Sequence, residues 1–131
     1  MDAKLTEKLK AKYDKLFINN PKIWCDNGWY SLIDNMCSAL QYNIVAYKQP
    51  QITITQIKEK WGGLQIYTDA CDEFQRGVIS LAYTISHNVC EKCGIYDVNI
   101  VSKTNSAHVQ SLCPICSEEI KDIMPTIGEN T

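Results

Sequence analysis

Cys90-Glu-Lys-Cys93 and Cys113-Pro-Ile-Cys116 are two C-x-x-C pairs with residues 94–112 between them. This spacing is typical of a zinc site built from four thiolates. Zinc binds four ligands at tetrahedral positions, with Zn–S distances near ~2.3 Å. A C-x-x-C turn points both of its thiolates at one ion, so we predict that Cys90, Cys93, Cys113 and Cys116 bind a single zinc ion. Four sulfur ligands leave no open position for water, and the predicted role of the ion is therefore structural.

Two other uses of these cysteines remain open from the sequence. Two disulfides would suit an oxidising compartment, but Met1 to Glu7 carry charges where a secretion signal has its apolar core. Cys-Pro-Ile-Cys before a helix also resembles a thioredoxin-type redox site, although no βαβ pattern surrounds it and the first pair would have no role. The chain has seven cysteines, and this odd number fits a reducing compartment. We therefore expect a soluble protein of the cytoplasm. The other cysteines, Cys25, Cys37 and Cys71, are interpreted as small buried apolar residues.

The length of 131 residues suits one compact unit with an appended zinc module. No apolar run approaches the ~20 residues that cross a bilayer. We divide the chain into a helix-helix-hairpin-helix core over residues 1–88, a zinc-ribbon module over residues 89–124 and a tail over residues 125–131. The predicted fold class is α+β, with helices packed on a β-hairpin.

Helical spacing of apolar residues predicts two helices in the first part of the chain. The first extends from about Ala3 to Phe17, and Pro21 follows because the residue before a proline disfavours helix. Residues 22–27 are a predicted connector. The second helix begins near Asp26 or Asn27, either of which can cap it, and fades over residues 42–47.

Alternating apolar and polar residues predict a β-hairpin in the middle of the chain. One strand begins at residues 52–55, a phase change at residues 56–57 suggests a bulge, Trp61-Gly62-Gly63 supplies the turn, and residues 64–68 form the second strand. Asp69 is the predicted cap of a third helix that continues to Cys90. Expected contacts between the hairpin and the helices involve Ile52, Ile54, Leu64 and Ile66 with Leu32, Met36, Phe74, Val78 and Leu81.

Within the zinc module, residues 98–101 and 108–111 are two short predicted strands, and residues 103–106 are the turn between them. Pro114 begins a predicted helix that reaches Met124, because proline at the first helical position loses no hydrogen bond. The ion must supply much of the folding free energy of a module this small.

The charge pattern disfavours a nucleic-acid partner. The net charge is −2, and Arg76 is the only arginine, although arginine is the usual bidentate reader of phosphate and guanine. From Cys90 onward acidic residues outnumber lysines, which is the wrong sign for gripping a polyanion. A mild basic patch occurs in the first segment. Its members are Lys4, Lys8, Lys10, Lys12, Lys15 and Lys22.

Three blocks of sequence occur in an order that resembles a known group of proteins. The blocks are Gly28-Trp29-Tyr30 with Leu32-Ile33 and Met36-Cys37, then Lys58-Glu-Lys-Trp-Gly-Gly-Leu-Gln-Ile-Tyr67, then the two C-x-x-C pairs. They resemble a group of small zinc-ribbon proteins of bacteriophages, prophages and bacteria, over roughly Asp26 to Cys116. The resemblance implies a phage or bacterial source and one compact unit, and it carries no assigned activity. Gln65 stands where the group often has arginine, and Trp61 where it has phenylalanine.

The sequence leaves three classes of function open. An enzyme needs an acid, a base or a nucleophile with a tuned pKa, and the chain offers only His87 and His108 beside its cysteines. His87 precedes Cys90 by three residues and is either a neighbour of the zinc site or a helix-end residue. A nucleic-acid regulator is the second class, supported by the zinc ribbon and the lysine-bearing first helix.

We favour the third class, a non-enzymatic module that binds a protein partner, because aromatic residues are enriched at interface hot spots. Trp29 is interpreted as a core residue and Trp61, at the hairpin turn, as a contact residue. The candidate contact set is Trp61, Gly62 and Tyr67. A host protein, such as one of a defence system, is the partner that the resemblance suggests.

Overall fold

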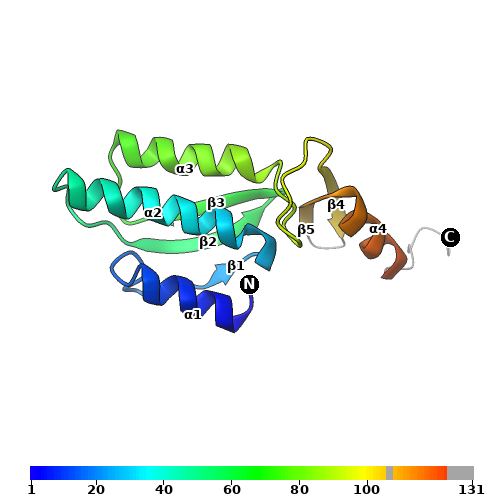
Figure 1. The fold of residues 1–131 in the computed structure, drawn as a ribbon, viewed down its shortest axis with the longest axis horizontal. Helices are drawn as coiled ribbons and strands as arrows, with labels where there is room; N and C mark the ends of the chain where they lie inside the picture. Colours follow the sequence, from blue (N-terminus) through cyan, green and yellow to red (C-terminus); the bar gives the residue numbers. More distant parts are fainter. Residues whose placement is uncertain (106–107, 124–131) are drawn as a thin grey trace.

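The computed structural model describes residues 1–105 and 108–123 and shows an α+β fold (Figure 1). It confirms the predicted class: helices lie on a small sheet, and a C-terminal module carries the four cysteines. The elements in chain order are α1 (Ala3–Lys12), β1 (Ile23–Trp24), the 3₁₀ turn η1 (Asn27–Trp29), α2 (Tyr30–Ala46), β2 (Ile54–Lys60), β3 (Gly63–Thr68), α3 (Glu73–Ser86), β4 (Val101–Asn105), β5 (His108–Leu112) and α4 (Pro114–Ile123).

The predicted hairpin is formed by β2 and β3, which pair antiparallel up to Lys60 and Gly63. Its two-residue turn is Trp61-Gly62, with φ of +54° and +83°. Positive φ at both positions is the geometry of the type I′ turn that matches the twist of a hairpin. The predicted bulge is present, but it lies slightly earlier, between Ile54 and Gln56.

A third strand was not predicted from the sequence. Within the segment interpreted as a connector, β1 pairs parallel with β2, and Ile23 faces Ile57. Two residues are too few to show an alternating pattern, so sequence periodicity carries no signal for this strand. In Figure 1, α1 lies beside β1 and α3 lies above the hairpin, so helices flank the sheet on both sides.

One apolar core joins these elements, and burial of each large side chain contributes roughly 1.5–3 kcal/mol. Its fully buried members include Leu9, Leu16, Trp29, Ile33, Leu40, Ile54, Ile57 and Leu64. The hairpin residues predicted to face the helices, Ile52, Ile54, Leu64 and Ile66, are all buried. Trp29 is therefore a core residue, as predicted.

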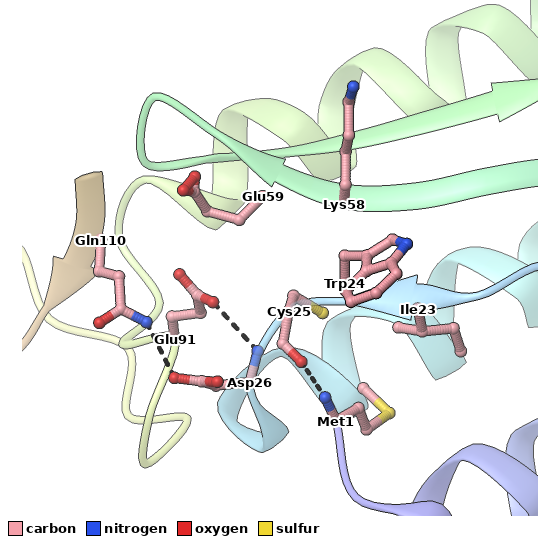
Figure 2. Close-up of a pocket in the computed structure, with 9 residues that line it drawn as sticks. All are labelled: Met1, Ile23, Trp24, Cys25, Asp26, Lys58, Glu59, Glu91 and Gln110. Atoms are coloured by element: carbon pink, nitrogen blue, oxygen red, sulfur yellow. Dashed lines mark hydrogen bonds between the residues drawn. The ribbon is translucent and has the colours of Figure 1, made fainter. Parts of the chain in front are cut away.

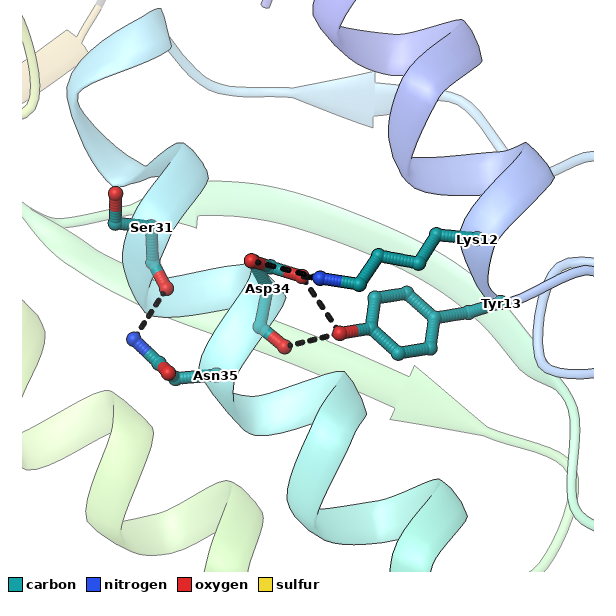
Figure 3. Close-up of polar contacts among 5 residues, drawn as sticks. All are labelled: Lys12, Tyr13, Ser31, Asp34 and Asn35. Atoms are coloured by element: carbon teal, nitrogen blue, oxygen red, sulfur yellow. Dashed lines mark hydrogen bonds and ion pairs between the residues drawn. The ribbon is translucent and has the colours of Figure 1, made fainter.

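The first helix is shorter than predicted. It ends at Lys12, and Leu16 and Phe17 enter the core from the turns that follow rather than from a helix. At this end, the Tyr13 hydroxyl donates to Asp34 Oδ1 at 2.6 Å, and Lys12 Nζ lies 3.0 Å from the same carboxylate (Figure 3). These contacts tie the end of α1 to α2.

The third helix differs from the prediction in its cap and in its buried face. Asp72 caps it, in a reciprocal capping box with Gln75, while Asp69 accepts from the backbone N–H of Thr53 and joins the two ends of the hairpin. Phe74 and Leu81 are 55% and 60% exposed, so their predicted packing on the hairpin is wrong. The helix instead buries Gln75, Ala82 and Ser86, with Val78 half-buried beside them.

Within the module, β4 and β5 pair antiparallel from Val101–Leu112 to Asn105–His108. The first strand begins at Val101 rather than Val98, and Lys103 to Asn105 extend it instead of forming the predicted turn. The predicted helix is present as α4, and its predicted last residue, Met124, lies outside the described residues together with the tail over residues 125–131. None of the helices in the described part of the chain has the length and apolar content that crossing a bilayer requires.

Candidate metal centre and the junction beside it

The structure brings the four predicted ligands together. Cys90 and Cys93 lie on the turn after α3, Cys113 follows β5, and Cys116 lies in the first turn of α4. All four sulfur atoms lie within 4.8 Å of one another. Cys93 Sγ and Cys113 Sγ are 3.7 Å apart, close to the edge of about 3.8 Å of a tetrahedron with metal–sulfur distances near 2.3 Å. The cluster is therefore suited to hold one metal ion.

Backbone N–H groups point at the sulfurs and hold the two turns in shape. The N–H of Cys93 donates to Cys90 Sγ at 3.5 Å, and the N–H of Cys116 donates to Cys113 Sγ at 3.4 Å. Gly94 closes the first turn with φ of +85°, a conformation that favours glycine. Such N–H groups stabilise thiolate over thiol, which is the form that binds metal.

The four thiols differ in how readily they ionise. Burial disfavours the Cys90 thiolate, but the N–H groups of Cys113, Cys93 and Lys92 outweigh it and lower the Cys90 pKa to about 7. The pKa of Cys116 is raised, chiefly by burial and then by the neighbouring thiols. A divalent cation among the four sulfurs reverses this balance, because it favours deprotonated thiols.

The structure also bears on the other uses of cysteine. All seven cysteines are unpaired, so the alternative of two disulfides does not match this structure. Cys25 and Cys37 are buried as predicted, whereas Cys71 is half-exposed. Burial raises the Cys25 pKa to about 12 and the Cys37 pKa still further, and a thiol that stays protonated is a poor nucleophile.

Neither histidine joins the cysteine cluster within the described residues. Nδ1 of His87 lies 3.0 Å from the carbonyl oxygen of Tyr83, one turn earlier in α3, and the two rings meet edge to face. His87 is therefore a helix-end residue, which was one of its two predicted roles. The side chain of His108 lies outside the described residues.

The module is fixed to the core by contacts that cross residue 89. The N–H of Gly28 donates to the carbonyl of Glu91 at 2.7 Å, and the buried indole N–H of Trp29 donates to the carbonyl of Val89 at 2.9 Å. A Cβ on Gly28 would overlap the backbone of Cys90 and Glu91. The turn that carries Cys90 and Cys93, here called the knuckle, therefore rests directly on η1, just before α2.

A cleft of about 720 Å³ lies at this junction (Figure 2). Its wall combines acidic and aromatic side chains from the core and from the module. The lining residues are Met1, Ile23, Trp24, Cys25, Asp26, Lys58, Glu59, Glu91 and Gln110. From the sequence, Asp26 was interpreted only as a helix cap, and Glu59 and Glu91 were not predicted to be site residues. Isolated acidic residues cannot be distinguished in a sequence from ordinary surface charge.

Glu91 is the unusual member of this cleft, since its side chain is only 2% exposed. Its Oε2 accepts from the backbone N–H of Asp26 at 3.0 Å, but its Oε1 has no hydrogen-bond partner among residues 1–105 and 108–123. Burial raises the Glu91 pKa to about 7; the Asp26 N–H opposes this shift and the carboxylates of Asp26 and Glu59 add to it.

The three residues predicted to contact a partner occupy different environments. Trp61 is 79% exposed at the tip of the hairpin. Gly62 is buried, and its carbonyl accepts from Ser111 Oγ of the module at 2.7 Å. Tyr67 is exposed at the other end of β3, on the order of 20 Å along the strand from Trp61. Gly62 therefore shapes the turn, and Trp61 is the side chain that the tip presents to solvent.

Comparison of the chain with protein-family models, with curated protein sequences and with solved structures finds no match.

Proposed function

We propose that this chain is a small, non-enzymatic zinc-binding protein that acts by binding a protein partner through the tip of its β2–β3 hairpin. In this proposal it is encoded by a phage or prophage and works in the cytoplasm of the bacterial host, where the partner is a host protein. The zinc ion is structural and holds the module against the hairpin.

The chemistry of the donor set supports a structural ion. Four sulfurs at tetrahedral spacing suit zinc or iron, and all four positions are taken by protein. Three of the four cysteines are buried, and Leu112 packs against them with Ile100 partly buried at the edge. A closed and shielded site favours stability over reaction. Elemental analysis of the purified protein should find one zinc per chain, whereas one iron per chain would contradict this part of the proposal.

Exposure of Trp61 is the observation that carries the partner proposal. A tryptophan that is 79% exposed at φ of +54° loses burial and accepts backbone strain, so folding alone does not explain the residue. The tip beneath it is held by the hydrogen bond between Ser111 and Gly62, and Gly63 leaves room for Tyr83 and His87 beside it. A large aromatic side chain on a fixed support is the usual form of an interface anchor.

The direct test is capture of a binding protein from nuclease-treated host lysate with immobilised wild-type and variant chains. Trp61→Ala should lower recovery of one specific protein at least tenfold, which corresponds to about 1.4 kcal/mol or more. Tyr42→Ala is the matched control, because Tyr42 is similarly exposed on α2. Equal recovery by wild type and Trp61→Ala, or loss of recovery after nuclease treatment, would contradict the proposal.

Nucleic-acid binding is the competing function, and the lysines of the first segment are the observation that favours it. Several of them already have partners: Lys12 pairs with Asp34, Lys10 donates to Asn20 Oδ1, and Lys8 lies over the ring of Tyr30. Binding to DNA that collapses with added salt would favour this function, since phosphate contacts depend steeply on salt.

A further inference from the structure

The cleft at the junction of core and module has features that metal binding and the hairpin tip do not use. Its volume of about 720 Å³ is within the range of small-molecule sites. Asp26, Glu59 and Glu91 bring three carboxyl groups to its wall, and Trp24 adds an indole that is 59% exposed. Figure 2 shows the Glu91 carboxyl group between Asp26 and Glu59, with Trp24 on the adjoining wall.

Of the described residues that line the cleft, the two basic groups, Lys58 and the amino group of Met1, are engaged elsewhere. The ammonium of Lys58 lies over the ring of Tyr67, 5.5 Å from its centre, and Figure 2 shows it directed away from the three carboxyl groups. The amino group of Met1 donates to the carbonyl of Cys25 at the opposite wall. Within the described residues, no ion pair involves Asp26 or Glu91.

Glu91 points independently to a missing ligand. A carboxylate that is 98% buried normally has all of its oxygens satisfied, because an unpaired buried acceptor costs roughly 1–3 kcal/mol or more. Here one oxygen, Oε1, has no partner among the described residues, and the residue lines the cleft. Folding alone gives no reason for an unpaired acceptor beside an open cavity. A ligand that brings a hydrogen-bond donor into the cleft would satisfy Oε1 and explain its position.

The arrangement favours an organic cation over a metal ion. In the part of the chain that the structure describes, the only group of three or more potential ligands with atoms close enough to share an ion is the four cysteines. The three carboxyl groups are therefore too dispersed for one metal ion. A guanidinium or ammonium group carries several N–H donors that reach separated acceptors, and its cationic plane or head stacks well on an indole.

We propose that this cleft binds a guanidinium or ammonium group, with Glu91 and Glu59 as the anionic acceptors and Trp24 as the aromatic wall. The group belongs either to a small free amine or to an arginine or lysine side chain of a peptide. Asp26 holds the Glu91 carboxyl through its backbone N–H and is itself held by Gln110, whose amide donates to Asp26 Oδ2 at 2.8 Å. Asp26 and Gln110 therefore act mainly by holding the Glu91 carboxyl group in position.

The test is a titration of the zinc-loaded full-length chain, followed by amide and indole NMR signals. Agmatine is the small probe, and acetyl-Gly-Arg-Gly-amide is the peptide probe. The indole signal of Trp24 and the side-chain amide signals of Gln110 should shift saturably. Glu91→Gln and Glu59→Gln should each weaken binding at least about fivefold, because each removes a charged acceptor and keeps the shape.

Glu118→Gln is the control variant, since Glu118 is exposed on α4 and does not line the cleft. It makes the same change in net charge and should alter the affinity less than about twofold. Tighter binding of the peptide than of agmatine assigns the source to a protein segment, and the reverse assigns it to a free amine. No saturable shift with either probe, equal weakening by Glu118→Gln, or displacement of agmatine by millimolar Mg²⁺ would overturn the proposal.

This proposal does not depend on the proposed partner at Trp61, because Trp61 does not line the cleft. Trp61→Ala should leave the agmatine affinity unchanged within about twofold, since the two sites share no side chain. A spectrum of Glu91→Gln that keeps the dispersion of wild type confirms that the variant is folded, and Glu59→Gln provides a second variant at a half-buried position.

Discussion

The core and the module reach a fixed structure by different physical means. In the core, three helices and a three-stranded sheet enclose large apolar side chains such as Trp29, Leu40 and Ile57. Among the residues of the module whose side chains the structure describes, the buried cluster consists of three cysteines and Leu112, with Ile100 partly buried beside it. A cluster this small cannot offset the conformational entropy of a whole ribbon. Burial of large apolar side chains accounts for the core, whereas a metal ion held by the four sulfurs would supply the stability that burial does not give the module.

Removal of the metal should have the largest effect and should separate the two regions. Chelation, or Cys113→Ser, should abolish the ordered signals of β4, β5 and α4 while the signals of α2 and the hairpin remain dispersed. The reason is that metal binding to four thiolates supplies on the order of 10 kcal/mol to a module of this kind. Residue-resolved amide spectra with and without chelator make the measurement. If the amide signals of β4, β5 and α4 stayed unchanged after complete loss of metal, the module would not depend on the ion and this prediction would be wrong.

The second prediction concerns the contact between the regions. Gly28→Ala should lower the free energy of unfolding by several kcal/mol, because its Cβ would overlap the backbone of Cys90 and Glu91. Gly77→Ala is the control, since nothing lies within 4 Å of a Cβ there and alanine favours helix by roughly 0.5–1 kcal/mol. Denaturant unfolding measures both variants. Equal stability of the two would show that the knuckle does not rest on Gly28.

The third prediction concerns Asp72, the cap of α3. Asp72→Ala should lower the free energy of unfolding by about 1 kcal/mol, because it removes the cap that accepts from the N–H of Gln75. Melting midpoints of the single variants measure the effect. Asp72→Asn should retain most of the stability, because asparagine is also a good cap. A larger loss for Asp72→Asn than for Asp72→Ala would contradict the capping role.

The smallest effect is expected from the contact between α1 and α2. The hydrogen bond from Tyr13, followed by those from Lys12, lowers the pKa of Asp34 below its ordinary value near 3.8. The ionised carboxylate therefore contributes stability at pH values above 3.8, and this contribution is lost as the pH falls through the lowered pKa. Because Lys12 is exposed and Asp34 is partly exposed, Asp34→Asn should cost less than about 1 kcal/mol at pH 7.

Stability curves of wild type and Asp34→Asn should converge near pH 2, where the Asp34 carboxyl is largely protonated in wild type as well. A difference that grows as the pH falls would contradict the sign of this contribution. Tyr13→Phe is the companion variant, because it removes the donor and keeps the ring in the core.

The sequence was most informative where one pattern determines the geometry. The two C-x-x-C pairs predicted which four sulfurs come together, because each turn brings two thiols to one site and four such ligands suit a zinc ion. Trp61-Gly62-Gly63 between two alternating segments predicted the hairpin turn, whereas the positive φ of Trp61 itself has no signal in the sequence. Alternation and helical spacing located α2, β2 and β3 to within a few residues.

The remaining features depend on contacts between distant residues. The short strand β1 is defined by its pairing with β2, and the exposure of Phe74 and Leu81 depends on how α3 rotates once Gln75 and Ser86 are hydrogen-bonded. The cleft requires Asp26, Glu59 and Glu91 to meet across three segments. No local pattern marks such a meeting, so these features emerge only from the folded chain.

The most direct test of the central claim is X-ray absorption spectroscopy at the zinc edge on the purified chain, with the metal content quantified in the same sample. We predict one zinc per chain, surrounded by four sulfur atoms at about 2.3 Å and by no lighter ligand. A metal-free chain that keeps an ordered module, or a zinc ion with nitrogen or oxygen in its first shell, would contradict the account.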